Sequence, residues 1–134
     1  MKIMIFFIVC IFLCVSTSII FAQDLANNYF ENGKAEYFDG DYKNAIEDFL
    51  EVINLDPKNK EAYCYIGLAK YQLSDYKKAI EYFTKAIETD PEYVDAYYNR
   101  TLAKFYVGDF AGSIADNAAV ICCLRTTRIT ASGA

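Results

Sequence analysis

Apolar residues recur three and four positions apart through most of the chain, which is the spacing that gathers them on one face of an α-helix. The pattern is clear in the middle of the chain, where Tyr63 and Ile66 belong to one run and Ile80 and Phe83 belong to the next. Residues that begin or end helices separate these runs. We therefore predict an all-α fold of six helices, at roughly 25–38, 42–54, 59–72, 76–88, 93–106 and 110–122.

The predicted helix boundaries have simple chemical causes. Gly40 and Gly108 permit the left-handed backbone conformation that commonly follows a helix. Asp75 can accept hydrogen bonds from the free amides in the first turn of the next helix. A proline follows Asp56 and another follows Asp90, and proline disfavours a helical conformation in the residue before it. The helices are thus expected in pairs, with a short turn inside each pair.

The same pattern returns every 34 residues. The segment GDYKNAIEDF at 40–49 recurs as SDYKKAIEYF at 74–83 and as GDFAGSIADN at 108–117. Self-similarity at this period indicates an array of stacked helix pairs, with units at about 26–59, 60–93 and 94–124. Two glycine–alanine combinations, Gly33 with Ala45 and Gly67 with Ala79, are expected to let the helices of a unit approach closely.

The carboxylates between Asp39 and Glu51 suggest a calcium loop, but their spacing does not fit one. An EF-hand loop needs glycine at its sixth position and glutamate at its twelfth. Counted from Asp39, these positions hold Asn44 and Leu50. The segment is better explained as a helix boundary capped by Asp41, and we expect neither a metal site nor a cofactor.

The repeated segments resemble the tetratricopeptide repeat family. The resemblance rests on NYFENGKAEYFDGDYKNAIEDFLEVINLDP at 28–57 and EAYCYIGLAKYQLSDYKKAIEYFTKAIETDP at 61–91, with Tyr63 where the family often has tryptophan. The third unit begins well and then departs, because Thr101 replaces the small glycine and Asn117 stands where Phe49 and Phe83 stood. Covering roughly residues 26–121, the resemblance implies a right-handed superhelical array of three helix-turn-helix repeats within residues 23–124.

In this family the first helices of successive repeats line a concave groove. The resemblance therefore implies a non-catalytic scaffold or adaptor that binds a peptide or protein segment in that groove. The residues that it places there are Phe30, Lys34, Phe38, Glu61, Tyr65, Leu68, Gln72, Asp95, Tyr98, Asn99 and Leu102.

Aromatic side chains are frequent on these first helices. They offer a large contact area with few rotatable bonds, which suits the binding of an extended peptide. We expect three of them to be exposed, namely Phe38, Tyr65 and Tyr98. Three others are expected to pack between neighbouring helices, namely Tyr37, Tyr71 and Phe105.

One binding mode of the family can be tested on the sequence. Members that hold the acidic C-terminal tails of chaperones use Lys, Arg and Asn on the first helices. The corresponding positions here are Phe30, Lys34, Tyr65, Asp95 and Asn99. One of these is basic, and a carboxylate at Asp95 would repel an acidic tail. We therefore expect that carboxylate clamp to be absent.

The N-terminal segment differs from the rest of the chain. Lys2 is followed by 13 apolar residues, Ile3–Val15, and then by Ser-Thr-Ser and a small residue at Ala22. This order is typical of a secretory signal peptide, here residues 1–22, and it predicts export to a periplasm or to the outside of the cell. The alternative is a membrane anchor, because residues 3–22 are long enough to span a bilayer if they are not cleaved.

Charge and residue content exclude several functions. Residues 24–116 hold all 18 acidic residues and 10 of the 13 basic ones, a net charge of −8 that repels nucleic acid. The chain has no histidine, no glycine-rich loop, and no zinc-type spacing among Cys64, Cys122 and Cys123. No nucleophile has a base to activate it, so we expect no enzymatic activity.

The C-terminal segment AAVICCLRTTRITASGA at 118–134 leaves alternatives open. Repeat arrays normally end with a helix whose outer face is polar, but Val120–Leu124 is apolar and is followed by a predicted irregular tail at 125–134. This pattern is compatible with homo-oligomerisation through the last repeat. It is equally compatible with a fragment of a longer repeat protein.

Overall fold

The computed structural model describes the backbone of residues 1–132 and the side chains of residues 1, 4 and 20–125. This part of the chain forms six helices and no strand, which confirms the all-α prediction. The helices are α1 (Lys2–Asp39), α2 (Tyr42–Leu55), α3 (Lys60–Gln72), α4 (Tyr76–Thr89), α5 (Val94–Tyr106) and α6 (Phe110–Ser132).

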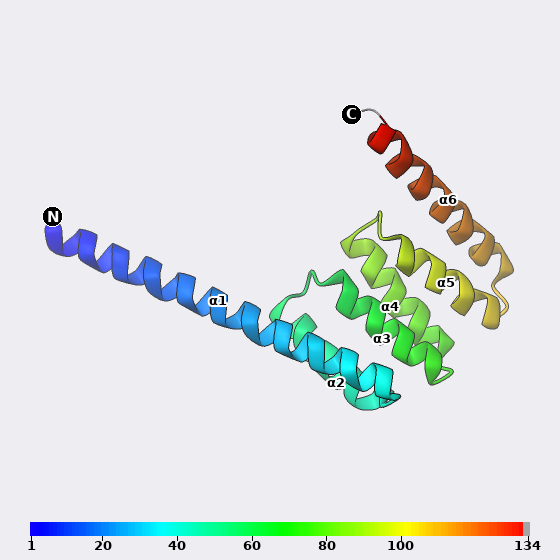
Figure 1. The fold of residues 1–134 in the computed structure, drawn as a ribbon, viewed down its shortest axis with the longest axis horizontal. Helices are drawn as coiled ribbons and strands as arrows, with labels where there is room; N and C mark the ends of the chain where they lie inside the picture. Colours follow the sequence, from blue (N-terminus) through cyan, green and yellow to red (C-terminus); the bar gives the residue numbers. More distant parts are fainter. Residues whose placement is uncertain (133–134) are drawn as a thin grey trace.

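The helices stack in chain order. Each packs against its neighbours in the sequence, so that α1 and α2, α3 and α4, and α5 and α6 form three hairpin pairs (Figure 1). The first helices of successive pairs also touch, α1 with α3 and α3 with α5. A row of first helices therefore runs along the stack, and we call the side of this row that carries the predicted site residues the first-helix face.

Helix α1 is much longer than the sequence pattern predicted. It begins at Lys2 rather than near residue 25, and its N-terminal half projects away from the stack (Figure 1). No glycine or proline occurs before Gly33, so no residue type that breaks helices interrupts it. The side chains of residues 2, 3 and 5–19, which make up most of the predicted signal peptide or anchor, lie outside the described part. Among the residues whose side chains are described, which leave out most of residues 3–22, no helix has the length and apolar content needed to cross a membrane.

Helix α6 corrects the prediction for the C-terminus. The last helix was predicted to end near residue 122 and to be followed by an irregular tail at 125–134, but α6 continues to Ser132. No glycine or proline lies between Ser113 and Ser132 to stop it, and the next glycine is Gly133. Residues 133 and 134 are outside the described part.

The helix boundaries follow the predicted chemistry. Gly40 and Gly108 adopt left-handed conformations, with φ of 85° and 82°, at the ends of α1 and α5. The carboxylates of Asp41 and Asp75 accept hydrogen bonds from the amides of the third residue beyond each, at the starts of α2 and α4. These caps satisfy amides that have no partner inside the helix.

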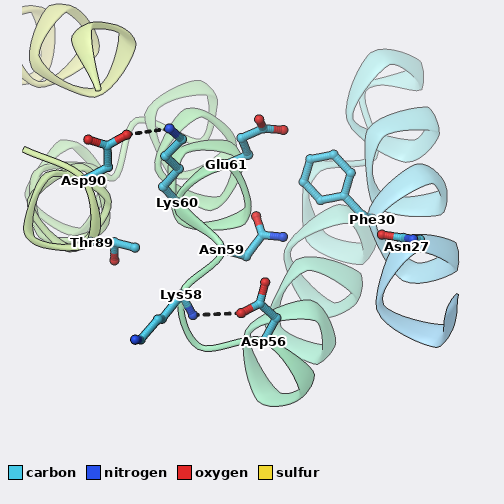
Figure 2. Close-up of a pocket in the computed structure, with 9 residues that line it drawn as sticks. All are labelled: Asn27, Phe30, Asp56, Lys58, Asn59, Lys60, Glu61, Thr89 and Asp90. Carbon is cyan, nitrogen blue, oxygen red and sulfur yellow. Dashed lines mark hydrogen bonds and ion pairs between the residues drawn. The ribbon is translucent and has the colours of Figure 1, made fainter. Parts of the chain in front are cut away.

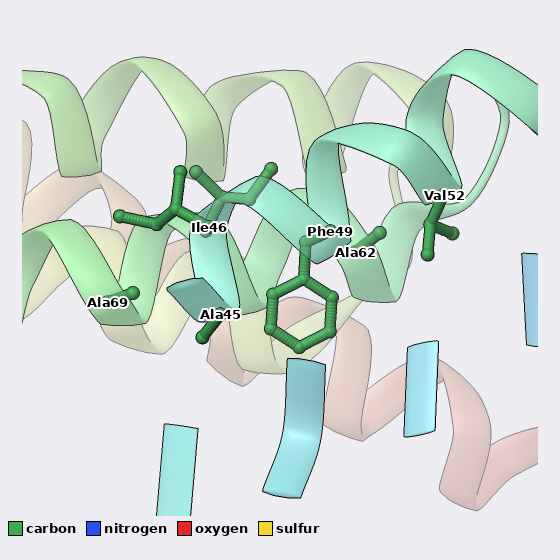
Figure 3. Close-up of a cluster of buried hydrophobic side chains, with 7 residues drawn as sticks. Ala45, Ile46, Phe49, Val52, Ala62 and Ala69 are labelled. Atoms are coloured by element: carbon green, nitrogen blue, oxygen red, sulfur yellow. The ribbon is translucent and has the colours of Figure 1, made fainter. Parts of the chain in front are cut away.

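Two buried phenylalanines centre the core of the first two pairs. Phe49 of α2 and Phe83 of α4 have no exposed surface. Phe49 belongs to an apolar cluster built from α2 and α3, which Figure 3 shows. A Cβ atom added to Gly67 would lie 2.6 Å from the ring of Phe83, and one added to Gly33 would lie 3.1 Å from the ring of Phe49. The close approach predicted for these glycines is thus made against a phenylalanine ring.

The difference between the two glycines gives a prediction. Gly67→Ala should destabilise the fold by about 1–3 kcal/mol, because the buried Phe83 ring has to move. Gly33→Ala should be close to neutral, since its milder contact is offset by the roughly 1 kcal/mol advantage of alanine in a helix. Urea unfolding of both variants measures this. Equal losses at the two positions would contradict the packing argument.

The third pair is held together differently. Asp116 of α6 is 4% exposed and accepts hydrogen bonds from Arg100 at 2.6 and 2.8 Å, while the Nζ atom of Lys104 lies 2.9 Å away. Arg100 also donates to Thr84 of α4 at 3.0 Å, which links the third pair to the second. Burial alone would raise the pKa of Asp116, but hydrogen bonds from Arg100 and Lys104 outweigh it and hold the pKa below its usual value.

Sequence analysis did not identify this ion-pair cluster. The signal was nevertheless present, because Arg100 stands 34 residues after Ile66, at a position that is fully buried in the second pair. A charged residue at a core position of a repeat requires a buried counter-charge. Asp116 is that counter-charge.

Asp116→Asn should destabilise the protein by roughly 3 kcal/mol at neutral pH, the lower end of the range for breaking a buried ion pair. The lower end applies because the Arg100 and Lys104 side chains keep 14% and 16% exposure. A lowered folded-state pKa stabilises the fold above the usual pKa, and that stability is lost as the pH falls through the folded pKa. The gap between wild type and variant should therefore close in acid. Thermal unfolding against pH measures it, with exposed Glu92→Gln as the control that leaves the transition unchanged.

Candidate functional site

All the predicted site residues lie on the three adjacent first helices, α1, α3 and α5. Their exposure differs. The exposed members are Phe38, Glu61, Gln72, Asp95 and Tyr98. The half-buried members are Phe30, Lys34, Tyr65, Leu68, Asn99 and Leu102.

The half-buried aromatics at the α1–α3 junction form one cluster. The Tyr65 ring stacks on Phe49 at a centroid distance of 5.0 Å, and Phe30 and Tyr37 meet it edge-on at 5.8 and 5.7 Å. The prediction that Tyr65 is exposed is therefore wrong, because Phe49 offers it a stacking surface. Tyr37 packs as predicted, and so does Tyr71 in the equivalent position of α3.

Other aromatic side chains are open to solvent. Phe38 is 73% exposed and Tyr98 is 57% exposed, as predicted. Phe105 was expected to pack between helices but is 59% exposed. Its ring meets Tyr106 and Phe110 edge-on, at 6.1 and 5.5 Å, and no first helix of a further pair lies beside α5 in the described part of the chain to cover it.

The charges of the first-helix face are mostly negative. The Nζ atom of Lys34 lies 2.9 Å from Glu31, and its hydrogen bond to that carboxylate raises the pKa of Lys34. Glu61 and Asp95 occupy the first turns of α3 and α5 and are exposed. A lysine engaged with its own glutamate leaves this face with an excess of carboxylates.

An open hollow of about 560 Å³ adjoins the face between α1, the α2–α3 loop and the end of α4 (Figure 2). Lys60 and Asp90 form an ion pair of 2.5 Å at one side, and Phe30 and Glu61 lie at the other. Asn59 accepts a hydrogen bond from the amide of Ala62 and so caps α3. Sequence analysis did not group these residues, since they come from separate repeats and meet only when the pairs stack.

Cys64 has no nucleophilic character. It is 3% exposed, and burial raises the pKa of its thiol to about 12. Reactive cysteines instead have lowered pKa values and access to solvent. Cys64 therefore acts as a small packing residue, and among the residues described no group of acidic or cysteine side chains has the arrangement of a metal site.

Comparison with protein families gives two overlapping matches. The family model described as tetratricopeptide repeat matches residues 61–93, and one described as TPR repeat matches residues 26–74. Together they span residues 26–93, which hold the first two helix pairs except the N-terminal part of α1, so α5 and α6 lie outside the matched residues. A search of curated protein sequences gave no match.

Solved structures of the same fold are numerous. The TPR2B domain of yeast Sti1, in a complex with pHsp70, has 27% identity and a TM-score of 0.72 over 74% of this chain and 79% of that one. The Arabidopsis OM64 TPR domain has 26% identity and a TM-score of 0.71 over 75% and 84%. The second TPR of Spaghetti (RPAP3), bound to the HSP90 peptide SRMEEVD, has 24% identity and a TM-score of 0.72 over 76% of this chain and 96% of that one. At this identity the similarity shows the fold alone.

Proposed function

This chain belongs to the tetratricopeptide repeat family, and on that premise we propose that it is a non-catalytic interaction module that binds a peptide or protein segment on its first-helix face. In this proposal its three helix pairs are three repeats of a right-handed superhelix, and the face is its concave groove. The observation that carries the proposal is the exposure of large aromatic side chains there, Phe38 and Tyr98 above all. Such side chains anchor partners because they bury much area at a small entropic cost.

One similar structure supports a protein or peptide segment as the ligand, since the Sti1 domain, at 27% identity, is described in a complex with pHsp70. The Spaghetti (RPAP3) domain, described with the acidic HSP90 peptide SRMEEVD, has 24% identity and supports the fold alone. The residues of this chain do not favour the same acidic ligand, since Lys34 is engaged by Glu31 and Asp95 is exposed on the same face. We therefore propose the mode of binding without that ligand.

Paired variants test the proposal. The double variant Phe38→Ala/Tyr98→Ala should lower partner recovery in affinity purification at least about tenfold, because each substitution removes an aromatic anchor. Leu50→Ala on α2 is the control, since Leu50 is also partly exposed but does not belong to a first helix. Mass spectrometry of the co-purified proteins measures both. Equal losses in the control, or the absence of any partner, would count against the proposal.

Self-assembly through α6 is a second candidate. Ile114, Ile121 and Leu124 are 71%, 58% and 54% exposed along this helix, an unusual amount of apolar surface for one element. Size-exclusion mass separates the two candidates, because self-assembly raises the mass above that of one chain without any partner. A peptide-binding monomer keeps the mass of one chain.

We further propose that residues 1–22 direct export and are removed after Ala22, which would place the protein in a periplasm or outside the cell. The support comes from Lys2, the apolar run Ile3–Val15 and Ala22. Intact mass of the purified protein should give a start at Gln23. A retained Met1 in the membrane fraction would instead favour the anchor.

A further inference from the structure

Charged groups on and beside the first-helix face are unequally paired. Two lysines of the first helices are held in ion pairs inside the chain, Lys34 by Glu31 at 2.9 Å and Lys60 by Asp90 at 2.5 Å. Lys58, at the rim of the hollow, extends away from Phe30 and Asn59 (Figure 2). Little positive charge is left on this face to meet an anionic ligand.

Two carboxylates on the face are not held in a close ion pair, although Glu61 adds to the raised pKa of Lys34 after the hydrogen bond from Lys34 to Glu31. Glu61 and Asp95 are exposed, and neither forms an ion pair within the part of the chain whose side chains are described. They stand 34 residues apart, at the same position of two adjacent first helices. Burial is the main cause of the raised pKa of Cys64, and the charges of Asp95 and Glu61 raise that pKa further. Both carboxylates therefore lie close enough to the Cys64 thiol to influence it.

An exposed aromatic ring lies near Asp95, one of these two carboxylates. Tyr98 follows Asp95 by three residues on α5, which places both on one side of the helix, and it is 57% exposed. The face of a tyrosine ring attracts a cation. The chain already uses this contact, with Lys60 5.0 Å from the ring centre of Tyr93 and Lys34 5.5 Å from that of Phe30.

Each acidic residue also has a local role, because a carboxylate in the first turn of a helix interacts favourably with the helix dipole. That role explains why each of α3 and α5 has an acidic residue in its first turn. It does not account for the exposed ring of Tyr98 beside Asp95, or for the pairing of the neighbouring lysines with other carboxylates.

We propose that the first-helix face selects an extended cationic segment of a partner protein, whose lysine or arginine side chains pair with Glu61 and Asp95 and lie over Tyr98. This inference rests on the proposed peptide-binding function and names the chemistry of the ligand. It predicts a preference opposite to that for an acidic peptide such as SRMEEVD, with which the Spaghetti (RPAP3) domain is described.

Three pools of labelled nonapeptides test the proposal. They share tyrosine, serine and glycine positions and differ at three fixed positions, which hold lysine, glutamine or glutamate. Fluorescence anisotropy measures their affinity for the full chain, kept in a non-ionic detergent because of its apolar N-terminal run. The lysine pool should bind about tenfold more tightly than the glutamine pool in dilute buffer, and the glutamate pool least tightly. Added salt should reduce the difference.

Three variants locate the effect. Glu61→Gln/Asp95→Asn should remove most of the preference for lysine. Glu81→Gln/Glu88→Gln, which changes the net charge equally on exposed positions of α4, should leave it intact. Tyr98→Leu keeps an apolar side chain but removes the aromatic face, so it should weaken binding of the lysine pool more than that of the glutamine pool.

The outcomes separate the two proposals. If no pool binds, the proposed peptide-binding function fails. If the pools bind equally, or glutamate binds best, the function stands and the preference for cationic segments is overturned. If both double variants reduce lysine binding alike, general attraction to an acidic surface explains the result, and the assignment to Glu61 and Asp95 is also overturned.

Discussion

The stack depends on one contact, the packing of a buried phenylalanine against a glycine. Phe83 of α4 lies against Gly67 of α3, and Phe49 of α2 lies against Gly33 of α1. Without a side chain on the glycine, the two helices of a pair approach closely enough for the ring to lose all contact with water. Burying a phenylalanine side chain is worth roughly 1.5–3 kcal/mol. The same contact sets the position of each first helix, and so it also sets where the site residues lie.

The third pair shows what happens when this contact is lost. Thr101 and Asn117 stand where the glycine and the phenylalanine would be, and Asp116 with Arg100 and Lys104 forms the centre of the pair instead. The positions of Asp116 and Lys104 hold Asp48 and Glu36 in the first pair. Loss of hydration, together with nearby carboxylates including Asp48, raises the pKa of Glu36. Identical backbone positions thus hold a satisfied ion pair at one end of the stack and two like charges at the other.

The division of charge on the first-helix face follows from how the helices pair and how the pairs stack. Lys60 and Asp90 are 30 residues apart in the chain, and they meet because the start of α3 and the end of α4 lie at the same edge of their pair. Glu61 and Asp95 occupy the same position in successive pairs, so stacking places them in one row. A short sequence change at these positions could therefore alter which ligands the face accepts without affecting the phenylalanine–glycine contacts below it.

The sequence by itself determined the helices, their pairing and the positions of the first-helix residues, because helical periodicity, capping residues and a 34-residue period are local and additive signals. It did not determine how far α1 and α6 extend, since the absence of helix-breaking residues is a weaker signal than their presence. Only the tertiary structure decided which aromatics are covered. Tyr65 is half-buried because Phe49 lies beside it, whereas Phe105 is open because no first helix of another pair covers it within the described residues. The ion pairs were likewise decided by the tertiary structure, because electrostatic partners are chosen by distance in space and not by spacing in the chain.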